Sequence, residues 1–519
     1  MRALHIDGNS LRLADLREVV YQNRPVLLEP EARQAVDRAR DIVEDLLARD
    51  RVAYAVNTGV GKLSEVRISP QDIRQLQLNL LRSHAVGVGE PLAQDVVRAM
   101  ILLRANSLAK GFSGVRDVVI DALCAMLNRG VHPVIPSQGS VGASGDLAPL
   151  SHLALVLVGE GEAYYEGKRI PGAEAIKRAD IAPLMLEAKE AISLINGTQA
   201  MLGVGLLAVL QAETLTDTAD VIGALTVDAL RGTDVAFDER IQAARPHAGQ
   251  FVSAHNLRLM MEGSEIRESH RQCGKVQDAY SLRCIPQVHG AVRDTIVHCR
   301  SVFEVEMNSA VDNPLVFPAA KKVGAPKPQI GDPVAGEILS GGNFHGEPVA
   351  FALDFLAIAL SALAGISERR VERLVNPSLN EDLPPFLAPG AGLNSGLMMA
   401  QVTAAALVNE NRVLAYPASV DSITTSGNKE DYVSMGMTSA NKLQRVVTNT
   451  QNVLAIEAMA VAQAIDFLAP LKANKRGQAA HAAIRKVSPR VTEDRILSND
   501  FARLSELIGS GALVRILQS

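Results

Sequence analysis

The chain has 519 residues, with 52 Lys and Arg against 57 Asp and Glu, which gives a formal net charge of −5. This length exceeds the roughly 250–300 residues that one hydrophobic core reaches, so we expect several packed regions or one extended bundle. The mildly acidic balance argues against nucleic acid or an anionic membrane as the main partner. Aromatic residues make up only 3% and Trp is absent, which favours closely packed helices over sheets.

Cysteine usage and apolar runs predict the compartment. Free thiols in a reducing environment are expected, because no CxxC spacing joins the four cysteines Cys124, Cys273, Cys284 and Cys299. The N-terminal residues lack the apolar run of a signal peptide. The longest apolar stretch, 349–366, is interrupted by Asp354, and we interpret it as a buried helix rather than a membrane span. From these features we expect a cytoplasmic protein that does not bind a membrane.

The first 195 residues are mixed in character. Residues 4–6 and 11–13, on either side of an Asp-Gly-Asn turn, predict a short hairpin, and 156–171 predict another. Apolar periodicity predicts helices at about 30–50, 70–83, 92–110 and 114–129. The stretch 131–150 is rich in Gly, Pro and Ser. It predicts a long irregular loop, and such loops in compact proteins usually carry function.

From residue 196 on, long runs rich in Ala, Leu and Val predict helices at 199–231, 286–311, 346–375, 397–415 and 436–469. The fold class expected is mainly α: an elongated bundle of long helices, with a smaller mixed N-terminal region that carries the loop 131–150. We expect three regions, 1–195, 196–475 and a helical tail at 476–519. The Pro-, Gly- and Lys-rich segment 318–338 predicts a surface loop.

Three familiar motifs fail their requirements. Residues 203–208 fit GxGxxA, but they lie in a helical run with no strand before them. Residues 59–62 (GVGK) lack the earlier Gly and the following Ser or Thr of a phosphate-binding loop. The eleven histidines include no HExxH and no Cys/His cluster, so no metal site is expected.

One short motif in the irregular loop carries unusual chemistry: Ala143-Ser144-Gly145, followed by Asp146. Gly145 lacks a Cβ, so its amide nitrogen can approach the carbonyl of Ala143 at an angle that other residues cannot reach. If that ring closes and water leaves, Ser144 becomes an exocyclic alkene, and Asp146 could assist the proton transfers. On the tripeptide alone, a flexible turn is the favoured interpretation.

Seven segments, in order, extend the signal along essentially the full chain: 54–59 (YAVNTG), 83–85 (SHA), 142–146 (GASGD), 196–199 (NGTQ), 277–284 (QDAYSLRC), 340–345 (SGGNFH) and 430–435 (EDYVSM). With these segments the chain resembles the aromatic amino acid ammonia-lyase family. The resemblance implies that Ala143, Ser144 and Gly145 form 4-methylideneimidazole-5-one (MIO), an electrophile made from the chain itself, so no external cofactor is needed.

The resemblance also assigns roles to other residues. Tyr54 corresponds to the base that removes the β-hydrogen of the substrate, a task for which a phenol needs neighbours that stabilise its anion. Asn196 and Tyr280 correspond to residues that line and polarise the electrophile. Arg283 corresponds to the residue that holds the substrate carboxylate. Pocket-lining positions correspond to Gln277 and Phe344.

Substrate choice follows from the ring-binding side. Ser83-His84 is the pair found in family members that act on histidine, and Glu430 is a carboxylate where phenylalanine enzymes generally have Gln. Both side chains can hydrogen-bond an imidazole, and Met398 matches a residue that contacts it. An apolar ring would leave these groups unpaired, at about 1–3 kcal/mol each. The resemblance thus implies the conversion of L-histidine into urocanate and ammonia.

Some positions depart from the pattern of those members: Lys429, Tyr432, Val60, Ala279 and a longer 318–338 loop. Because Lys429 and Tyr432 flank Glu430, a tyrosine or phenylalanine lyase, or an aminomutase, stays open as an alternative. A fumarase-type lyase would carry a GSxxMPxKxN-like loop, which the sequence lacks. An inactive helical scaffold would have a broken Ala-Ser-Gly or lack the Tyr or Arg, and all are present.

Long apolar helices also bear on assembly. Helices above 30 residues project beyond a compact monomer, and one chain would struggle to cover their apolar faces. Together with the resemblance, this implies a homotetramer whose active sites are shared between chains, with the small-molecule substrate as the only other partner.

Overall fold

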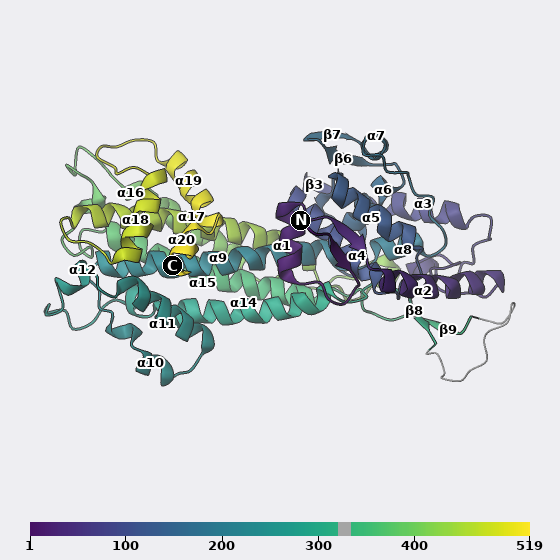
Figure 1. Cartoon of the computed structure of the whole chain (residues 1–519), viewed down its shortest axis with the longest axis horizontal. Coiled ribbons are helices and arrows are strands. Elements are labelled where there is room, and N and C mark those ends of the chain that lie inside the picture. The colour runs from purple at the N-terminus through teal and green to yellow at the C-terminus, as the bar shows by residue number, and fades with distance from the viewer. Residues whose placement is uncertain (320–333, 519) are drawn as a thin grey trace. The chain divides into compact units, whose positions relative to one another are not determined.

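The structure is a computed structural model that describes residues 1–319 and 334–518 (Figure 1). It is mainly α-helical, as predicted. Its contacts divide into two compact units, each made of three stretches of chain. The first unit comprises Met1–Leu207, Ser301–Leu353 and Ala418–Asn441, and the second comprises Ala208–Arg300, Asp354–Pro417 and Lys442–Ser519. The predicted regions 1–195, 196–475 and 476–519 stay a prediction.

The first unit contains short helices and small sheets. Its helices are α1 (Leu13–Gln22), α2 (Pro30–Ala48), η1 (Gly61–Leu63), α3 (Ile73–His84), α4 (Gln94–Ala109), α5 (Asp117–Arg129), α6 (Leu147–Leu157), α7 (Gly172–Arg178), α8 (Glu190–Ile195) and η4 (Ser426–Asn428). Its strands are β1 (Leu4–Ile6), β2 (Val26–Leu28), β3 (Val88–Pro91), β4 (His132–Pro133), β5 (Pro136–Gln138), β6 (Glu162–Tyr165), β7 (Lys168–Pro171), β8 (Leu315–Pro318) and β9 (Gly336–Leu339).

Helix α4 is the centre of this unit. All its residues from Val96 to Ala109 are buried, so it has no polar face, as expected of a helix that is surrounded by protein. Helix α2 is instead amphipathic, begins at Pro30 and buries one stripe. Helix α5 ends at Gly130, which adopts the left-handed conformation typical of a helix C-terminus. These caps and faces explain why the four N-terminal helices lie close to their predicted bounds.

The predicted hairpin at 4–6 and 11–13 is wrong. The Asp7 carboxylate does accept the amides of Asn9 and Ser10, at 2.8 Å each, so a turn exists. The chain then enters α1, because Asp15 accepts the Arg12 amide at the helix start. Strand β1 pairs in parallel with β2, the strand that follows α1 in the sequence. The second predicted hairpin is confirmed as β6 and β7.

The second unit is helical. Its complete elements are η2 (Val235–Phe237), α10 (Glu239–Ala243), α11 (Ala248–Met261), α12 (Glu265–Glu268), α13 (Tyr280–Arg283), η3 (Pro385–Leu387), α16 (Met398–Leu414), α18 (Lys475–Val487), α19 (Ser498–Gly509) and α20 (Ala512–Gln518). It contains a buried ion pair: the Arg370 guanidinium and the Glu457 carboxylate, both fully buried, bind at two points.

Four long helices contribute to both units: α9 (Gln199–Ala229), α14 (Ile285–Met307), α15 (Glu347–Val375) and α17 (Gly436–Phe467). All four were predicted within a few residues. Among the described residues, α9 and α15 are long and apolar enough to cross a membrane by length and composition, but 78% and 61% of their most apolar windows is buried inside the protein. Of the predicted loop 318–338, residues 320–333 lie outside the described residues.

Candidate active site

The loop between β5 and α6 doubles back on itself at the Ala-Ser-Gly tripeptide. Gly142 and Ala143 each form a backbone bridge with Gly145. Gly142 and Gly145 adopt positive φ angles, +73° and +69°, which side chains disfavour. The turn therefore brings the backbone of Gly145 against that of Ala143, as the closure of a ring between them requires.

Gly145 is also required by packing. A Cβ at this position would lie 2.1 Å from the carbonyl oxygen of Gly197, closer than any real contact. Gly145 and Gly197 form a parallel bridge, and the amide of Asp146 donates to the same Gly197 oxygen at 2.6 Å. The tripeptide is thereby joined to the turn between α8 and α9.

Asp146 anchors the loop to the start of α9. Its carboxylate is fully buried and accepts the amides of Ala200 and Met201, both at 2.9 Å, in the first turn of α9. The Ser140 hydroxyl donates to its other oxygen at 3.0 Å. Burial raises the pKa of Asp146 to about 6, although these hydrogen bonds act in the opposite direction. Asp146 can thus hold or release a proton near neutral pH.

Ser144 is held at both its polar groups. The hydroxyl donates to Oε1 of Glu430 at 2.8 Å, and the carbonyl accepts from Nδ2 of Asn196 at 2.7 Å. Asn196 is buried, and its Oδ1 has no hydrogen-bond partner among the described residues. An unpaired buried acceptor is costly, so this oxygen is available to a donor brought by a ligand.

Asn196 is positioned by a buried cation. Arg104, on α4, donates from Nη1 to the carbonyls of Ser193 and Asn196, at 2.9 and 2.7 Å. These carbonyls end α8, where a helix lacks internal donors and favours positive charge. Burial lowers the pKa of Arg104 to about 10, which still leaves it charged at neutral pH. Arg104 therefore fixes the backbone from which Asn196 reaches Ser144.

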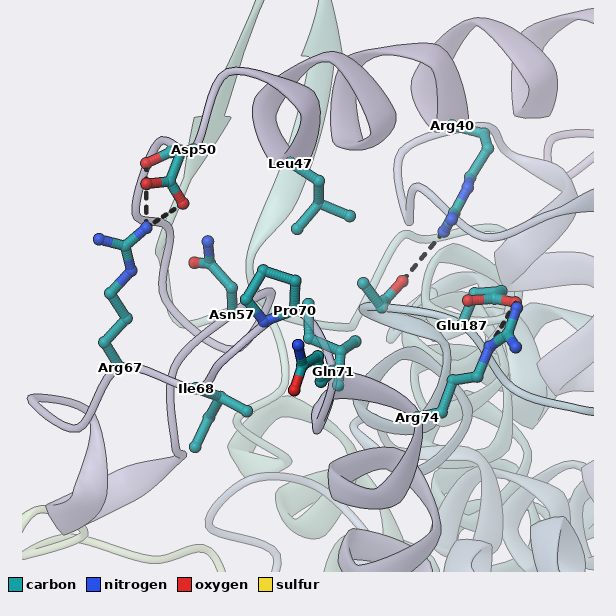
Figure 2. Close-up of a pocket in the computed structure, with 12 residues that line it drawn as sticks. Arg40, Leu47, Asp50, Asn57, Arg67, Ile68, Pro70, Gln71, Arg74 and Glu187 are labelled. Carbon is teal, nitrogen blue, oxygen red and sulfur yellow. Dashed lines mark hydrogen bonds and ion pairs between the residues drawn. The ribbon is translucent and has the colours of Figure 1, made fainter.

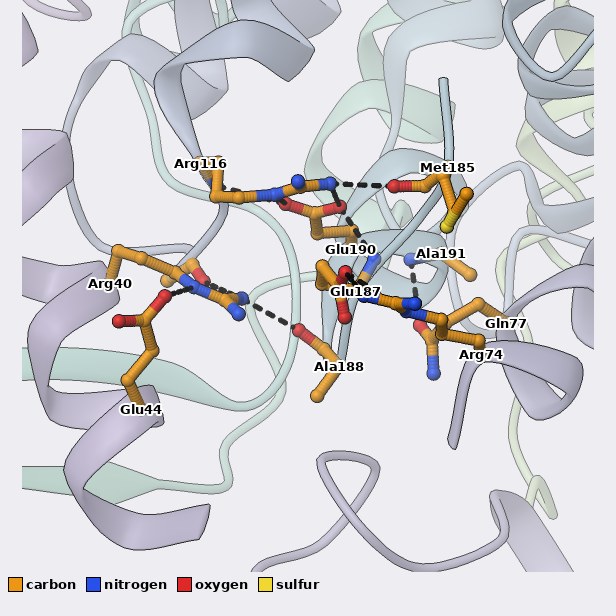
Figure 3. Close-up of polar contacts among 11 residues, drawn as sticks. Arg40, Glu44, Arg74, Gln77, Arg116, Met185, Glu187, Ala188, Glu190 and Ala191 are labelled. Atoms are coloured by element: carbon orange, nitrogen blue, oxygen red, sulfur yellow. Dashed lines mark hydrogen bonds and ion pairs between the residues drawn. The ribbon is translucent and has the colours of Figure 1, made fainter. Parts of the chain in front are cut away.

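Ion pairs hold the start of the same helix (Figure 3). Glu190, fully buried, binds the Arg116 guanidinium through both carboxylate oxygens, at 2.7 and 2.8 Å. Arg74 pairs with Glu187 at 2.6 Å, and the Gln77 side chain accepts the amide of Ala191 at 3.0 Å. Helix α8 has only six residues, so it depends on these contacts rather than on its own hydrogen bonds.

Glu430 follows η4 and is itself tethered. The Thr425 hydroxyl donates to Oε2 of Glu430 at 2.8 Å, and the Thr425 amide donates to the Glu430 carbonyl at the same distance. One carboxylate oxygen thus binds Thr425 and the other Ser144. Lys429 is exposed, and no ion pair joins it to Glu430 in the described part of the chain. The carboxylate is therefore not neutralised by its neighbour.

Tyr432, the second departure near Glu430, stacks on His345. The ring centroids are 6.1 Å apart with an interplanar angle of 20°, and Nε2 of His345 donates to the Tyr432 carbonyl at 3.2 Å. Phe344 precedes this histidine in the turn before α15 and is half-buried. The structure thus brings Phe344 and the 430–435 segment to the same unit as Ser144.

Tyr54 lies in a loop that its neighbours close. Oδ1 of Asn57 accepts the Ala53 amide at 3.0 Å, and Oγ1 of Thr58 accepts the amide of Ala55, which has a positive φ of +55°. The Tyr54 hydroxyl oxygen accepts the Gly61 amide at 3.2 Å. That N–H is one neighbour of the kind that stabilises a phenolate.

His84 is the last residue of α3. Its Nδ1 lies 2.8 Å from the carbonyl of Leu80. A carbonyl can only accept, so Nδ1 carries the proton and Nε2 is left as an acceptor. The side chain is half-buried and can receive one hydrogen bond from a ligand.

A cavity of about 440 Å³ is lined in part by Asn57, three residues after Tyr54 (Figure 2). Its guanidinium groups are already engaged. Arg67 pairs with Asp50, and Arg40 donates to the Ala188 carbonyl at 3.0 Å. We assign no ligand to this cavity.

Four predicted site residues belong to the second unit. Gln277 is exposed, and Tyr280 is 71% exposed. The Arg283 guanidinium lies 4.6 Å from the Tyr280 ring centroid, and its Nε donates to the Asp278 carbonyl at 3.0 Å. The two terminal nitrogens remain for a carboxylate. Met398 begins α16 and is 38% exposed.

The sequence analysis missed residues that hold the site without entering it, namely Ser140, Arg104, Thr425 and Ser434. The Ser434 hydroxyl donates to the Gly142 carbonyl at 3.3 Å. The signal for Ser434 was its place in the 430–435 segment. Arg104 follows five apolar residues, 99–103, in the middle of a helix, which could have marked it as a buried cation with a specific task. For Ser140 and Thr425 the sequence offers no comparable signal.

Comparison with known proteins identifies the family to which the sequence is similar. The family profile described as aromatic amino acid lyase matches residues 11–486. A histidine ammonia-lyase of Koribacter versatilis (strain Ellin345) is 72% identical over 513 residues, which cover 99% of each chain.

Two solved structures show the same fold. Histidine ammonia-lyase from Trypanosoma cruzi has a TM-score of 0.89 and 40% identity, covering 100% of this chain and 95% of its own. Tyrosine aminomutase from Streptomyces globisporus has a TM-score of 0.91 and 37% identity, covering 99% of this chain and 98% of its own.

No group of three or more His, Cys, Asp or Glu side chains that could hold a metal ion occurs within 1–319 and 334–518.

Proposed function

The chain belongs to the aromatic amino acid lyase family, and from that membership we propose that it is a histidine ammonia-lyase. It would eliminate ammonia from L-histidine without oxidation and release trans-urocanate, the first step of histidine degradation. The observation that carries the substrate assignment is the carboxylate of Glu430, held 2.8 Å from the Ser144 hydroxyl. It provides a charged acceptor for an imidazole N–H beside the reacting group.

We propose that residues 143–145 become MIO, and the surrounding residues fit that group. The backbone is already folded into a turn at Gly145, the space beside Gly145 is closed to a side chain, and Oδ1 of Asn196 is buried without a partner. MIO, once formed, supplies an electrophilic alkene that captures an amine. Nδ2 of Asn196, on the Ser144 carbonyl, would stabilise negative charge that develops on that oxygen.

The remaining roles follow from the chain's own groups. Oη of Tyr54, as a phenolate stabilised by the Gly61 N–H, would take the β-proton of the substrate. The terminal nitrogens of Arg283 would hold the substrate carboxylate. Nε2 of His84 would accept an imidazole N–H, and Met398 would contact the ring. Tyr280 would lie beside the electrophile, with Gln277 and Phe344 lining the pocket.

A tyrosine or phenylalanine lyase, or an aminomutase, is the second candidate. The similarity to tyrosine aminomutase and the Tyr432–His345 stack favour it. Glu430 and the acceptor Nε2 of His84 argue against it, because an apolar ring would leave both without a partner.

We further propose a cytoplasmic homotetramer in which neighbouring chains complete each site. Val297, Phe355 and Ile358, on α14 and α15, are exposed. Phe355 and Ile358 border an open apolar groove of about 760 Å³. Exposed apolar surface of this extent is typical of a subunit interface. The exposure of Tyr280 also suits a residue that serves the site of another chain.

Incubation with L-histidine tests the function directly. The ultraviolet absorbance of urocanate should rise, and ammonia should appear in equal amount. Tyr54→Phe should abolish the signal without unfolding the protein. Turnover of L-tyrosine in preference to L-histidine, or formation of a β-amino acid in place of urocanate, would support the second candidate instead.

A further inference from the structure

Ser144 meets Glu430 before any substrate is present. The Ser144 hydroxyl donates to one carboxylate oxygen, Thr425 donates to the other, and Asn196 holds the Ser144 carbonyl. That hydroxyl is the group that maturation removes, so this hydrogen bond exists only in the precursor. Because the mature enzyme lacks this hydrogen bond, any function of the bond must lie in maturation.

We propose that Glu430 positions the Ser144 hydroxyl for the maturation of the tripeptide, in addition to its later contact with substrate. The inference rests on the proposed function, because it concerns the formation of MIO. Glu430 would thereby serve in sequence as a positioning residue for the precursor and as a binding residue for imidazole.

The chemistry balances without an added reagent. The Gly145 nitrogen forms a bond to the Ala143 carbonyl carbon and passes its hydrogen to the oxygen of that carbonyl. This oxygen then leaves as water with the hydrogen of the Ser144 nitrogen, and a C=N bond forms between the Ala143 carbon and the Ser144 nitrogen. In the second loss, the Cα–H bond of Ser144 breaks and its electron pair becomes the Cα=Cβ bond. The Cβ–O bond breaks, and the hydroxide leaves with the released proton as the second water.

Positioning matters in the second loss. The Cβ–O bond must be aligned with the breaking Cα–H bond, so that the electrons of that bond can form the Cα=Cβ bond. A free serine side chain distributes itself among three staggered rotamers, and not all of them give this alignment. The hydrogen bond to Glu430 selects one of them, and Thr425 keeps the carboxylate in place. An amide oxygen can accept the same bond, so Gln at 430 should still position the hydroxyl, whereas Ala should not.

The test is the intact mass of the purified full-length chain, followed with time after expression. Wild type should lie about 36 Da below the encoded mass, for the loss of two waters. Glu430→Gln should reach the same mass. Glu430→Ala should remain at the encoded mass or about 18 Da below it, with the ring closed and the hydroxyl kept. We expect it to mature about ten- to a hundredfold more slowly, the factor for one hydrogen bond to a charged group.

Asp431→Ala is the matched control, since Asp431 is the neighbouring carboxylate and is exposed; it should mature like wild type. If Glu430→Ala does not fold, Thr425→Val decides, because it keeps the carboxylate and removes its tether. It should slow maturation, and Thr425→Ser should restore the rate.

Two outcomes separate the claims. Full mass loss in Glu430→Ala, or in Thr425→Val where the first variant is unfolded, at the wild-type rate overturns the positioning role and leaves the proposed function intact. An unchanged mass in active wild-type protein would instead remove MIO itself, and the positioning role with it.

Discussion

Ser144 lies between two side chains of different chemical character. Asn196 can donate to its carbonyl, whereas Glu430 can only accept from its hydroxyl. Charge that develops on the carbonyl oxygen is stabilised on one side, and the leaving or incoming polar group is bound on the other. Residues this close act as a unit, so their single substitutions should not add.

Replacing Glu430 with Gln should separate ring recognition from maturation. The amide keeps an acceptor oxygen but loses the charge that favours an imidazole N–H. We expect kcat/KM for L-histidine to fall roughly a hundredfold, which corresponds to about 2.7 kcal/mol, with little change in Tm. Steady-state kinetics would measure it, with Asp431→Asn as the control. Unchanged turnover of histidine would contradict the assignment of Glu430 to substrate recognition.

Asp146 should make stability depend on pH. Burial raises its pKa from 3.8 to about 6, so the folded state holds the proton more tightly than the unfolded chain. Its contribution is therefore fully present below pH 4 and is lost as the pH rises to about 6. The loss is about 3 kcal/mol. In a Ser144→Ala background, Asp146→Asn should flatten the free energy of unfolding between pH 4 and 6.

Urea unfolding at several pH values would measure that difference. The Ser144→Ala protein serves as the reference, because neither chain can then mature and the comparison isolates the carboxyl group. Parallel curves for the two proteins would show that Asp146 does not titrate in this range.

Sequence reasoning identified the groups that we propose to touch substrate and not those that hold them. Ser144, Asn196 and Glu430 belong to contiguous segments that can be recognised. Arg104 acts across the fold, at 2.7 Å from the Asn196 carbonyl, and Thr425 holds Glu430 from five residues away, at 2.8 Å. Which side chains become partners depends on how the chain folds, and a pattern along the sequence does not show this.

At the scale of elements, the site is a meeting of helix ends. Asp146 is the N-cap of α6, Asn196 is the C-cap of α8 and α9 begins at Gln199. Asp146, directly after the tripeptide, donates its amide to the Gly197 carbonyl between α8 and α9, and its carboxylate accepts the amides of Ala200 and Met201 at the start of α9. Helix ends provide free amides and carbonyls, and these backbone groups hold the loop together with the side chains of Asp146 and Asn196.

Gly197→Ala should disrupt this junction. Its φ is +150°, and an added Cβ would lie 2.6 Å from Oε1 of Gln199 and 3.0 Å from Nη2 of Arg104. We expect a loss of about 2–4 kcal/mol of unfolding free energy from the strained backbone and the clash. Gly167→Ala, in the open turn between β6 and β7 with nothing within 4 Å, should cost about 1 kcal/mol. Chemical denaturation of both variants would compare them, and equal losses would contradict the role of the junction.

Long helices were predictable because their period persists over many residues, as in α9 and α17. The start of the chain was not, because three residues on each side of a turn carry too little pattern to separate a hairpin from a strand that precedes a helix. Asp15, which caps α1 through the Arg12 amide, decided the outcome.

At the scale of the whole molecule, the proposed tetramer makes a prediction that the single chain does not. Tyr54 belongs to the first unit and Arg283 to the second. If neighbouring chains complete each site, one intact copy of each residue suffices for some sites in a mixed oligomer. Mixing and refolding inactive Tyr54→Phe and Arg283→Ala proteins should restore part of the activity towards L-histidine.

Sedimentation of the same mixture would give the oligomeric state. A monomer that turns over histidine would contradict shared sites. Tetramers without recovered activity would mean that both residues come from one chain. Each variant refolded alone provides the baseline.

The contacts around the tripeptide also order events in biosynthesis. Val141 accepts the amide of Met435 at 2.9 Å, Gly142 accepts the Ser434 hydroxyl, and Ser144 binds Glu430. A ribosome must therefore translate about 290 residues beyond the serine before its last partners exist, an interval that takes tens of seconds at about 5–20 residues per second. A nascent chain stalled before residue 418 should consequently still carry an ordinary serine at 144.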